Sequence, residues 1–156
     1  MVKLDVMFKC DLENVTELTL PTNARWYFNI EFEGDEKEIY LIPAEKLEVP
    51  NSRGECCFVM HSKETKKHAT VTFIKNAEYN ESDSGKLKRI GTFECRGCEL
   101  VKFLPRSGWE ASSTKSDTSF DDIDLTEGDW ADYDERGNES VMISELETEI
   151  CRSKEK

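Results

Sequence analysis

Residues 3–12 alternate between polar and apolar side chains with one exception, and this alternation constrains the fold more than any other feature. The apolar positions run from Leu4 to Leu12 at every second residue, and only Met7 interrupts the polar positions between them. A period of two places successive side chains on opposite faces of a β-strand. The pattern therefore predicts a strand that is buried on one face only.

The same pattern recurs along the chain between turn-forming residues. Trp26, Phe28, Ile30 and Phe32 alternate with their neighbours in a second expected strand, which Gly34 ends. Further strands are expected at residues 38–42, 55–61, 69–74, within 87–104 and at 141–150. Many short strands with few helix signals predict an all-β chain of two packed, mostly antiparallel sheets or an irregular barrel.

Chain length and polar stretches define the expected domain organisation. A chain of 156 residues suits a single domain over residues 1–156 with one core. Residues 76–86 are polar and residues 108–121 are rich in Ser and Thr, so both are expected to be long loops. Residues 152–156 are expected to form a flexible tail.

The charge balance limits the classes of partner. The formal net charge is −12, from 33 acidic and 21 basic residues, so nucleic acid and anionic membranes would be repelled. The N-terminus has no apolar run of the length a signal peptide or membrane span needs. We therefore expect a cytoplasmic protein that can also be present in the nucleus. In these compartments its cysteines would be reduced. The expected partner is another protein.

A CxxC pair at Cys95 and Cys98 is the one metal-like spacing in the chain. Structural zinc usually takes four ligands, and the other candidates fit poorly. The cysteines at 56–57 are adjacent and would point to opposite faces of a strand, whereas His61 and His68 lie outside zinc-finger spacing. A weak site built on Cys95 and Cys98, completed by His61, His68 or the acidic segment near the C-terminus, remains the alternative.

A redox role for the same pair has little support in its surroundings. Reactive CxxC pairs usually lie at a helix N-terminus, which lowers the pKa of the thiol. Here Glu94 and Glu99 flank the pair and are expected to raise that pKa, opposed by Arg96 alone. Two small thiols near a turn are therefore the favoured interpretation.

Residues 121–135 are densely acidic, but they do not match a calcium loop. When the loop is started at Asp122, Gly128 falls at position seven, one residue beyond the position an EF-hand needs. Charged and aromatic residues on loops often contact partners. Candidate binding residues are therefore Asp129, Trp130, Asp132 and Tyr133 in this segment, with Arg25 and Trp26 on the second strand. Core anchoring of the two tryptophans is the competing interpretation.

No sequence motif indicates catalysis. The chain has no nucleophile elbow, P-loop or dinucleotide fingerprint. We therefore expect a protein that is not an enzyme. An enzyme of unknown reaction, with titratable groups converging in a deep pocket, stays open as a further class.

Five blocks resemble the eukaryotic CXXC-motif-containing zinc-binding proteins, a family without an established activity. The blocks are LENVTEL at 12–18, ARWYF at 24–28, SRG at 52–54, FECRG at 93–97 and DWADYDERGNESV at 129–141. The resemblance implies one compact β protein with two CxxC pairs on hairpins, which together hold a structural zinc ion.

The zinc ligands that the resemblance implies are absent from this chain. The first pair aligns with Phe32 and Asp35, and the second aligns with Ser62 and Thr65. No cysteine lies within residues 25–50, so the first pair is missing in any register. The resemblance also implies that the Cys95–Cys98 pair is not one of the two zinc pairs. We expect no bound cofactor and a non-catalytic binding or adaptor protein that has lost its family's zinc.

Loss of a structural metal removes folding energy that other contacts must supply. Phe32 would place an apolar ring where a thiolate would be. Asp35 could form an ion pair with Lys63, Lys66 or Lys67 across the two hairpin tips. The hairpins, with their former zinc knuckles, are expected to meet at one end of the molecule.

Overall fold

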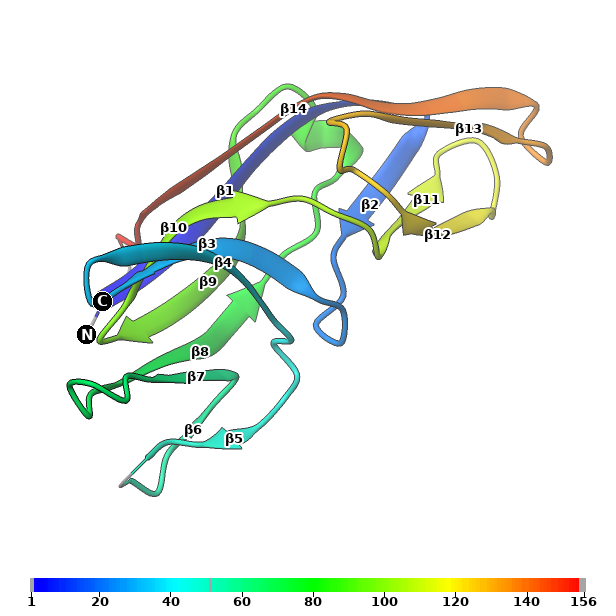
Figure 1. The fold of residues 1–156 in the computed structure, drawn as a ribbon. Helices are drawn as coiled ribbons and strands as arrows, with labels where there is room; N and C mark the ends of the chain where they lie inside the picture. Colours follow the sequence, from blue (N-terminus) through cyan, green and yellow to red (C-terminus); the bar gives the residue numbers. More distant parts are fainter. Residues whose placement is uncertain (1, 51, 155–156) are drawn as a thin grey trace.

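The structure is a computed structural model that describes residues 2–50 and 52–154, and it is built almost entirely from β-strands (Figure 1). Within these residues no helix is long and apolar enough to cross a membrane. A 3-10 turn, η1 (Glu81–Asp83), is the one helical element described. The strands are β1 (Val2–Glu13), β2 (Val15–Thr19), β3 (Trp26–Phe32), β4 (Asp35–Leu41), β5 (Leu47–Glu48), β6 (Glu55–Cys56), β7 (Phe58–His61), β8 (His68–Asn76), β9 (Lys88–Arg96), β10 (Glu99–Leu104), β11 (Trp109–Ser113), β12 (Ser119–Ile123), β13 (Trp130–Asp134) and β14 (Glu139–Arg152).

The strands form several antiparallel sheets, which confirms the predicted all-β class. The largest sheet has six strands in the order β13-β14-β1-β9-β8-β7, and two three-stranded sheets have the orders β10-β3-β4 and β12-β11-β2. A short β5-β6 ribbon completes the set. The expected first strand is β1, whose alternate residues Val6 and Phe8 are fully buried.

Aromatic side chains join the β10-β3-β4 sheet to the six-stranded sheet. Phe93 of β9 makes edge-to-face contacts with Trp26 and Phe28 of β3, at ring-centroid distances of 5.6 and 5.5 Å. Phe103 of β10 lies 5.2 Å from Phe28. Such pairs add about 0.5–1.5 kcal/mol beyond the area they bury. The apolar face of β3 is therefore the centre of the core.

The expected loop at 108–121 was wrong, because most of it is a β-hairpin. β11 pairs with β2 on one side and β12 on the other. Its buried residues Trp109, Ala111 and Ser113 follow the period of two, but the small side chains concealed the pattern. The expected tail at 152–156 is corrected in part: β14 continues to Arg152, while residues 155–156 lie outside the described chain.

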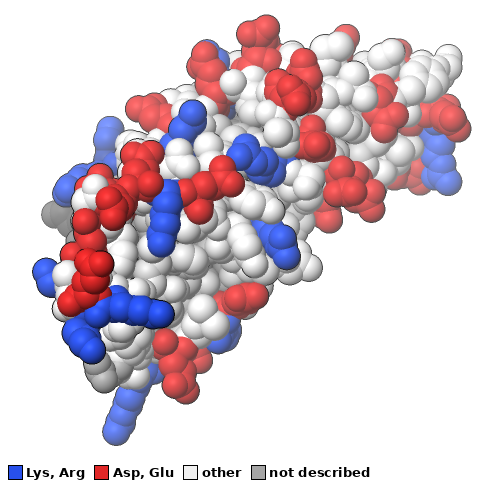
Figure 2. Space-filling view, in the orientation of Figure 1, with Lys and Arg blue, Asp and Glu red and all other residues white. Residues whose placement is uncertain are grey.

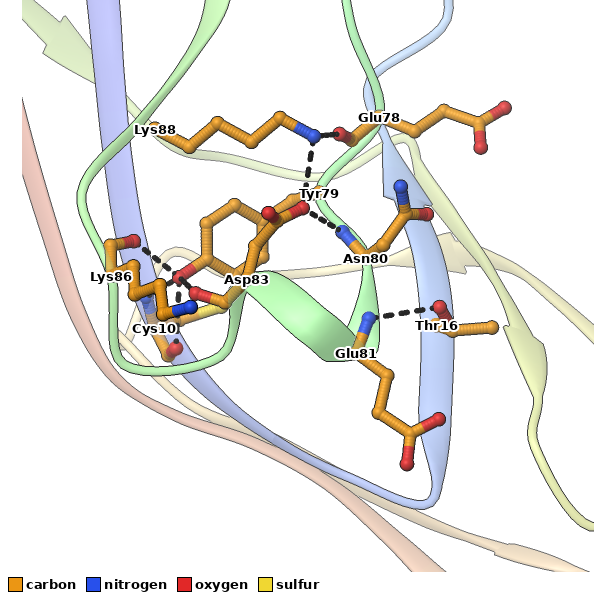
Figure 3. A network of polar contacts seen from close by, with 9 residues as sticks. All are labelled: Cys10, Thr16, Glu78, Tyr79, Asn80, Glu81, Asp83, Lys86 and Lys88. Carbon is orange, nitrogen blue, oxygen red and sulfur yellow. Dashed lines mark hydrogen bonds and ion pairs between the residues drawn. The ribbon is translucent and has the colours of Figure 1, made fainter.

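The expected loop at 76–86 is present, but a buried tyrosine anchors it (Figure 3). The hydroxyl group of Tyr79 lies 2.6 Å from the backbone oxygens of both Asp83 and Lys86, and 3.2 Å from that of Cys10. Backbone bonds with Leu18 in both directions hold the start of the loop, at 2.9 and 2.8 Å. The loop is therefore packed against β1 and β2 through Tyr79, which is fully buried.

We expect Tyr79→Phe to reduce the free energy of unfolding by about 1–3 kcal/mol. The substitution keeps the ring, but it removes the hydroxyl that contacts the Lys86 oxygen and accepts the buried Cys10 N–H. Loss of a partner leaves such backbone groups with part of their desolvation cost uncompensated. Chemical denaturation measures the effect. Tyr133→Phe is the matched control, because Tyr133 is exposed and should change stability by less than about 0.5 kcal/mol. Equal stabilities for the two variants would contradict the anchoring role.

Candidate functional site

Two hairpin tips meet at one end of the molecule, as the resemblance implied. The β3–β4 turn has positive φ at Glu33 and Gly34 (57° and 82°), the conformation that favours a tight two-residue hairpin. In the β7–β8 turn, the Ser62 N–H donates to the Lys67 oxygen and the Lys66 N–H donates to the Ser62 oxygen, both at 2.9 Å. The two turns are therefore locally rigid.

A hydrogen bond and a polar cleft join the tips. The Thr65 hydroxyl donates to Glu33 Oε1 at 3.2 Å. A cleft of about 430 Å³ lies beside this contact, and its lining includes the four positions at which the resemblance led us to expect the family's cysteines: Phe32, Asp35, Ser62 and Thr65. Positions 30 residues apart in sequence are therefore brought together in space.

The side chains at these four positions do not fit a zinc ion. Phe32 has no donor atom, and it is half-buried against the core. The Ser62 hydroxyl already accepts the Thr65 N–H at 3.2 Å, and the Thr65 hydroxyl is bound to Glu33. Over residues 2–50 and 52–154, no group of three or more His, Cys, Asp or Glu side chains could hold a metal ion.

The expected ion pair across the tips was wrong. In the described chain, no lysine of the β7–β8 turn lies within ion-pair distance of Asp35. The two tips are joined instead by the hydrogen bond that the uncharged Thr65 hydroxyl donates to Glu33. At the base of the second tip, His61 and His68 face each other across the strands with their rings stacked at 4.6 Å.

The Cys95–Cys98 pair lies elsewhere, in the β9–β10 turn. Gly97 between them has φ +74°, and a Cβ there would lie 2.7 Å from the His68 oxygen, so only glycine fits this turn. Cys95 is buried and Cys98 half-buried, and both are free thiols. The turn therefore brings two thiols together, and among the residues that the structure describes no third His, Cys, Asp or Glu side chain joins them in a metal-binding group.

The pKa values of the two thiols are shifted in opposite directions. A hydrogen bond with Cys98, together with burial, raises the pKa of Cys95. The same hydrogen bond lowers the pKa of Cys98. The expectation that the pKa of the whole pair would be raised was therefore wrong for Cys98, because the hydrogen bond with Cys95 outweighs the effect of burial.

Of the surface residues proposed on the second strand, Arg25 is exposed and Trp26 is not. Trp26 is 1% exposed, and its indole N–H donates to the Pro21 oxygen at 3.1 Å. Its candidacy as a binding residue was wrong, because it is a core anchor. The Arg25 guanidinium lies 4.5 Å from the ring centroid of Tyr40, an exposed cation–π contact.

The proposed acidic loop is largely a strand, β13, at the opposite end of the molecule from the hairpin tips (Figure 1). Asp129, Asp132 and Tyr133 are exposed, as the proposal required. Trp130 is half-buried against Phe120, with ring centroids 5.4 Å apart. In this view Asp and Glu side chains lie at both ends, whereas Lys and Arg lie mainly toward the end of the hairpin tips, so acidic side chains predominate around β13 (Figure 2).

Sequence reasoning missed a buried carboxylate at this acidic end. Asp134, the last residue of β13, is fully buried. Its oxygens accept hydrogen bonds from the hydroxyls of Ser113, Ser116 and Thr118 and from the backbone N–H of Gly137. These donors, Ser113 first, hold the pKa of Asp134 well below its usual range. The Ser/Thr-rich stretch before it was the available signal.

Comparison with known proteins identifies the family and agrees with the fold. Residues 5–151 match the family model described as "CXXC motif containing zinc binding protein, eukaryotic". A protein of that name from Bos taurus is 36% identical over 153 residues, covering 94% of this chain and 96% of its own length. The Homo sapiens protein of the same name is 34% identical, with the same coverage.

Two solved structures share the fold over nearly their full length. The crystal structure of C1orf123 superimposes with a TM-score of 0.89 at 32% identity, covering 97% of this chain and 99% of that one. A hypothetical protein from Plasmodium falciparum superimposes with a TM-score of 0.88 at 31% identity, covering 97% of this chain and 100% of its own. The chain belongs to the eukaryotic family of CXXC-motif-containing zinc-binding proteins.

Proposed function

We propose that this chain is a non-catalytic, cytoplasmic binding protein that has lost its family's structural zinc. The hydrogen bond from Thr65 to Glu33, in a cleft lined by the four aligned positions, is the observation that carries the proposal. In this proposal, side-chain contacts take the place at which the resemblance leads us to expect the ion. The names of the relatives give no enzymatic activity, which agrees with a binding role.

Stabilisation of the tips then comes from packing and turn chemistry. Phe32 contributes apolar surface next to the core, in place of a thiolate. The positive-φ turn at Glu33 and Gly34 fixes one hairpin, and the backbone bonds of Ser62 fix the other. Each of these contacts contributes little free energy. A hairpin that is joined to a large core, however, needs less stabilisation from local contacts than an isolated zinc ribbon does.

A second candidate function is metal binding at a relocated site. The lowered pKa of Cys98 beside Cys95 favours it, because the thiolate is the form that binds metal. Two thiols supply half of a tetrahedral site, so a partner protein or solvent would have to complete it. This candidate predicts metal in the purified protein.

We expect protein purified without chelators to contain less than about a tenth of an equivalent of zinc, because four thiolate ligands are missing. Elemental analysis by mass spectrometry measures the content, and the human relative provides a comparison for the method. About one equivalent of zinc that is lost in Cys95→Ser would establish the relocated site instead. Zinc that persists in Cys95→Ser would refute both functions as stated.

A further inference from the structure

Two strand edges face each other across an open groove. β4 is the edge of the β10-β3-β4 sheet, and β7 is an edge of the six-stranded sheet. A groove of about 500 Å³ lies between them, lined by residues 38–42 on one side and residues 57–59 on the other. Unpaired strand edges of this kind are templates for an additional strand.

The register of β7 shows which of its backbone groups point toward the groove. The Ser62 N–H donates to the Lys67 oxygen, which makes 62 and 67 a hydrogen-bonded pair of the β7–β8 hairpin. Such pairs alternate along an antiparallel ladder. Val59, three residues earlier, therefore directs its N–H and C=O away from β8, on the side where the groove lies.

The lining chemistry selects the kind of strand that would fit. Aliphatic and aromatic side chains dominate, and the charged residues in the lining are two carboxylates, Glu38 and Glu45, with no lysine or arginine. Glu38 also binds Arg106 at 2.9 Å, whereas no ion pair of Glu45 is found in the described chain. An apolar groove with free negative charge complements aliphatic side chains interspersed with basic ones.

The charge of the chain also argues against a second copy in the groove. Two copies would each carry a net charge of −12, and their acidic surfaces would repel at close approach. A basic segment of another protein meets no such penalty. The occupant favoured by the groove is therefore heterologous.

We propose that the groove between β4 and β7 binds an extended segment of a partner protein as an added β-strand, with aliphatic side chains alternating with Lys or Arg. Main-chain hydrogen bonds to the two edges supply affinity, and the apolar floor and Glu45 supply selectivity. The inference rests on the proposed binding function, but it does not depend on whether the hairpin tips hold zinc.

The test uses a fluorescein-labelled hexapeptide of alternating lysine and valine with blocked ends, titrated with the full chain in ~0.15 M salt. We expect saturable anisotropy with a Kd on the order of 10–100 µM. Glu45→Lys should weaken binding at least about fivefold. Val59→Pro should weaken it about tenfold, because it removes an edge N–H without breaking a bond to β8.

The control variant is Glu127→Lys, an equal charge change at an exposed position outside the groove lining, which should leave Kd unchanged. Melting curves confirm that each variant is folded, and backbone amide shifts in the wild-type protein should concentrate at Tyr40 and Val59. The proposal would be overturned if binding did not saturate at about 1 mM peptide. It would also be overturned if Glu127→Lys and Glu45→Lys lost the same affinity for the peptide, or if the amide chemical-shift changes lay outside the groove. A homodimer that Val59→Pro dissociates would overturn it as well, because it would identify a second copy as the occupant. Metal content is measured separately, so either proposal can fail alone.

Discussion

We expect Asp134→Ala to lower the melting temperature by about 10 °C at neutral pH, among the largest effects of any single substitution in this chain. The carboxylate is fully buried and accepts bonds from three hydroxyls and one backbone N–H. Removing it leaves the buried Ser113 hydroxyl without this acceptor, and it removes the hydrogen bonds that Asp134 makes to the β11–β12 and β13–β14 turns. The exposed contact between Arg136 and Asp117 would still join the two turns. Thermal unfolding followed by circular dichroism measures the loss.

The charge of Asp134 matters as well as its shape, and Asp134→Asn separates the two. The pKa of Asp134 is lower in the folded state than the usual value of about 3.9. The ionised carboxylate therefore contributes its full share to the free energy of unfolding above about pH 3.9, and this share is lost as the pH falls toward the pKa of the folded state. The difference in melting temperature between wild type and Asp134→Asn should therefore narrow between pH 7 and pH 3. Asp129→Ala, at an exposed position in the same segment, is the control for the loss of a carboxylate that is not buried. A constant difference across this range would show that shape alone matters.

The strand content was predictable because period-two alternation is a direct consequence of strand geometry. β1, β3 and β14 each bury alternate residues, and each was expected from its side chains. The arrangement of strands into sheets was not predictable, because pairing between distant segments leaves no local signal. β1, for example, lies between β9 and β14, which come from the far half of the chain.

The residues after β10 show why a polar composition did not identify the strands within residues 108–121. Ser and Thr usually mark loops, but here Ser113, Ser116 and Thr118 direct their hydroxyls at a buried carboxylate. The recipient, Asp134, lies 16 residues beyond Thr118. Trp26 illustrates the opposite error, since a conspicuous residue next to Arg25 was read as surface although it alternates into the core.

The hairpin tips were the part of the site that the resemblance predicted best. The contact between them and the shared cleft appear where the aligned positions lie. The link itself, from Thr65 to Glu33, was not predicted. A hydrogen bond between two exposed turns depends on their separation in space, and neither sequence block contains that information.

We expect a variant carrying Phe32→Cys, Asp35→Cys, Ser62→Cys and Thr65→Cys to bind about one equivalent of zinc. The four positions line one cleft, and each pair spans two residues across a tight turn, which is the spacing of a zinc knuckle. Structural zinc sites bind with apparent free energies of about 10–16 kcal/mol, far more than the contacts that the substitutions remove. The melting temperature should rise by about 10 °C with zinc and fall again with chelator.

The half-site variant, Phe32→Cys with Asp35→Cys, separates a rebuilt site from general thiol binding. It carries two of the four thiolates, so it should hold zinc weakly and gain no thermal stability, because a closed tetrahedral site needs both tips. If the fourfold variant folds but takes up no more zinc than the half-site variant, the tips have diverged from knuckle geometry. If it takes up one equivalent, the hairpins of this chain still have the geometry that zinc requires, and only the ligands have been lost.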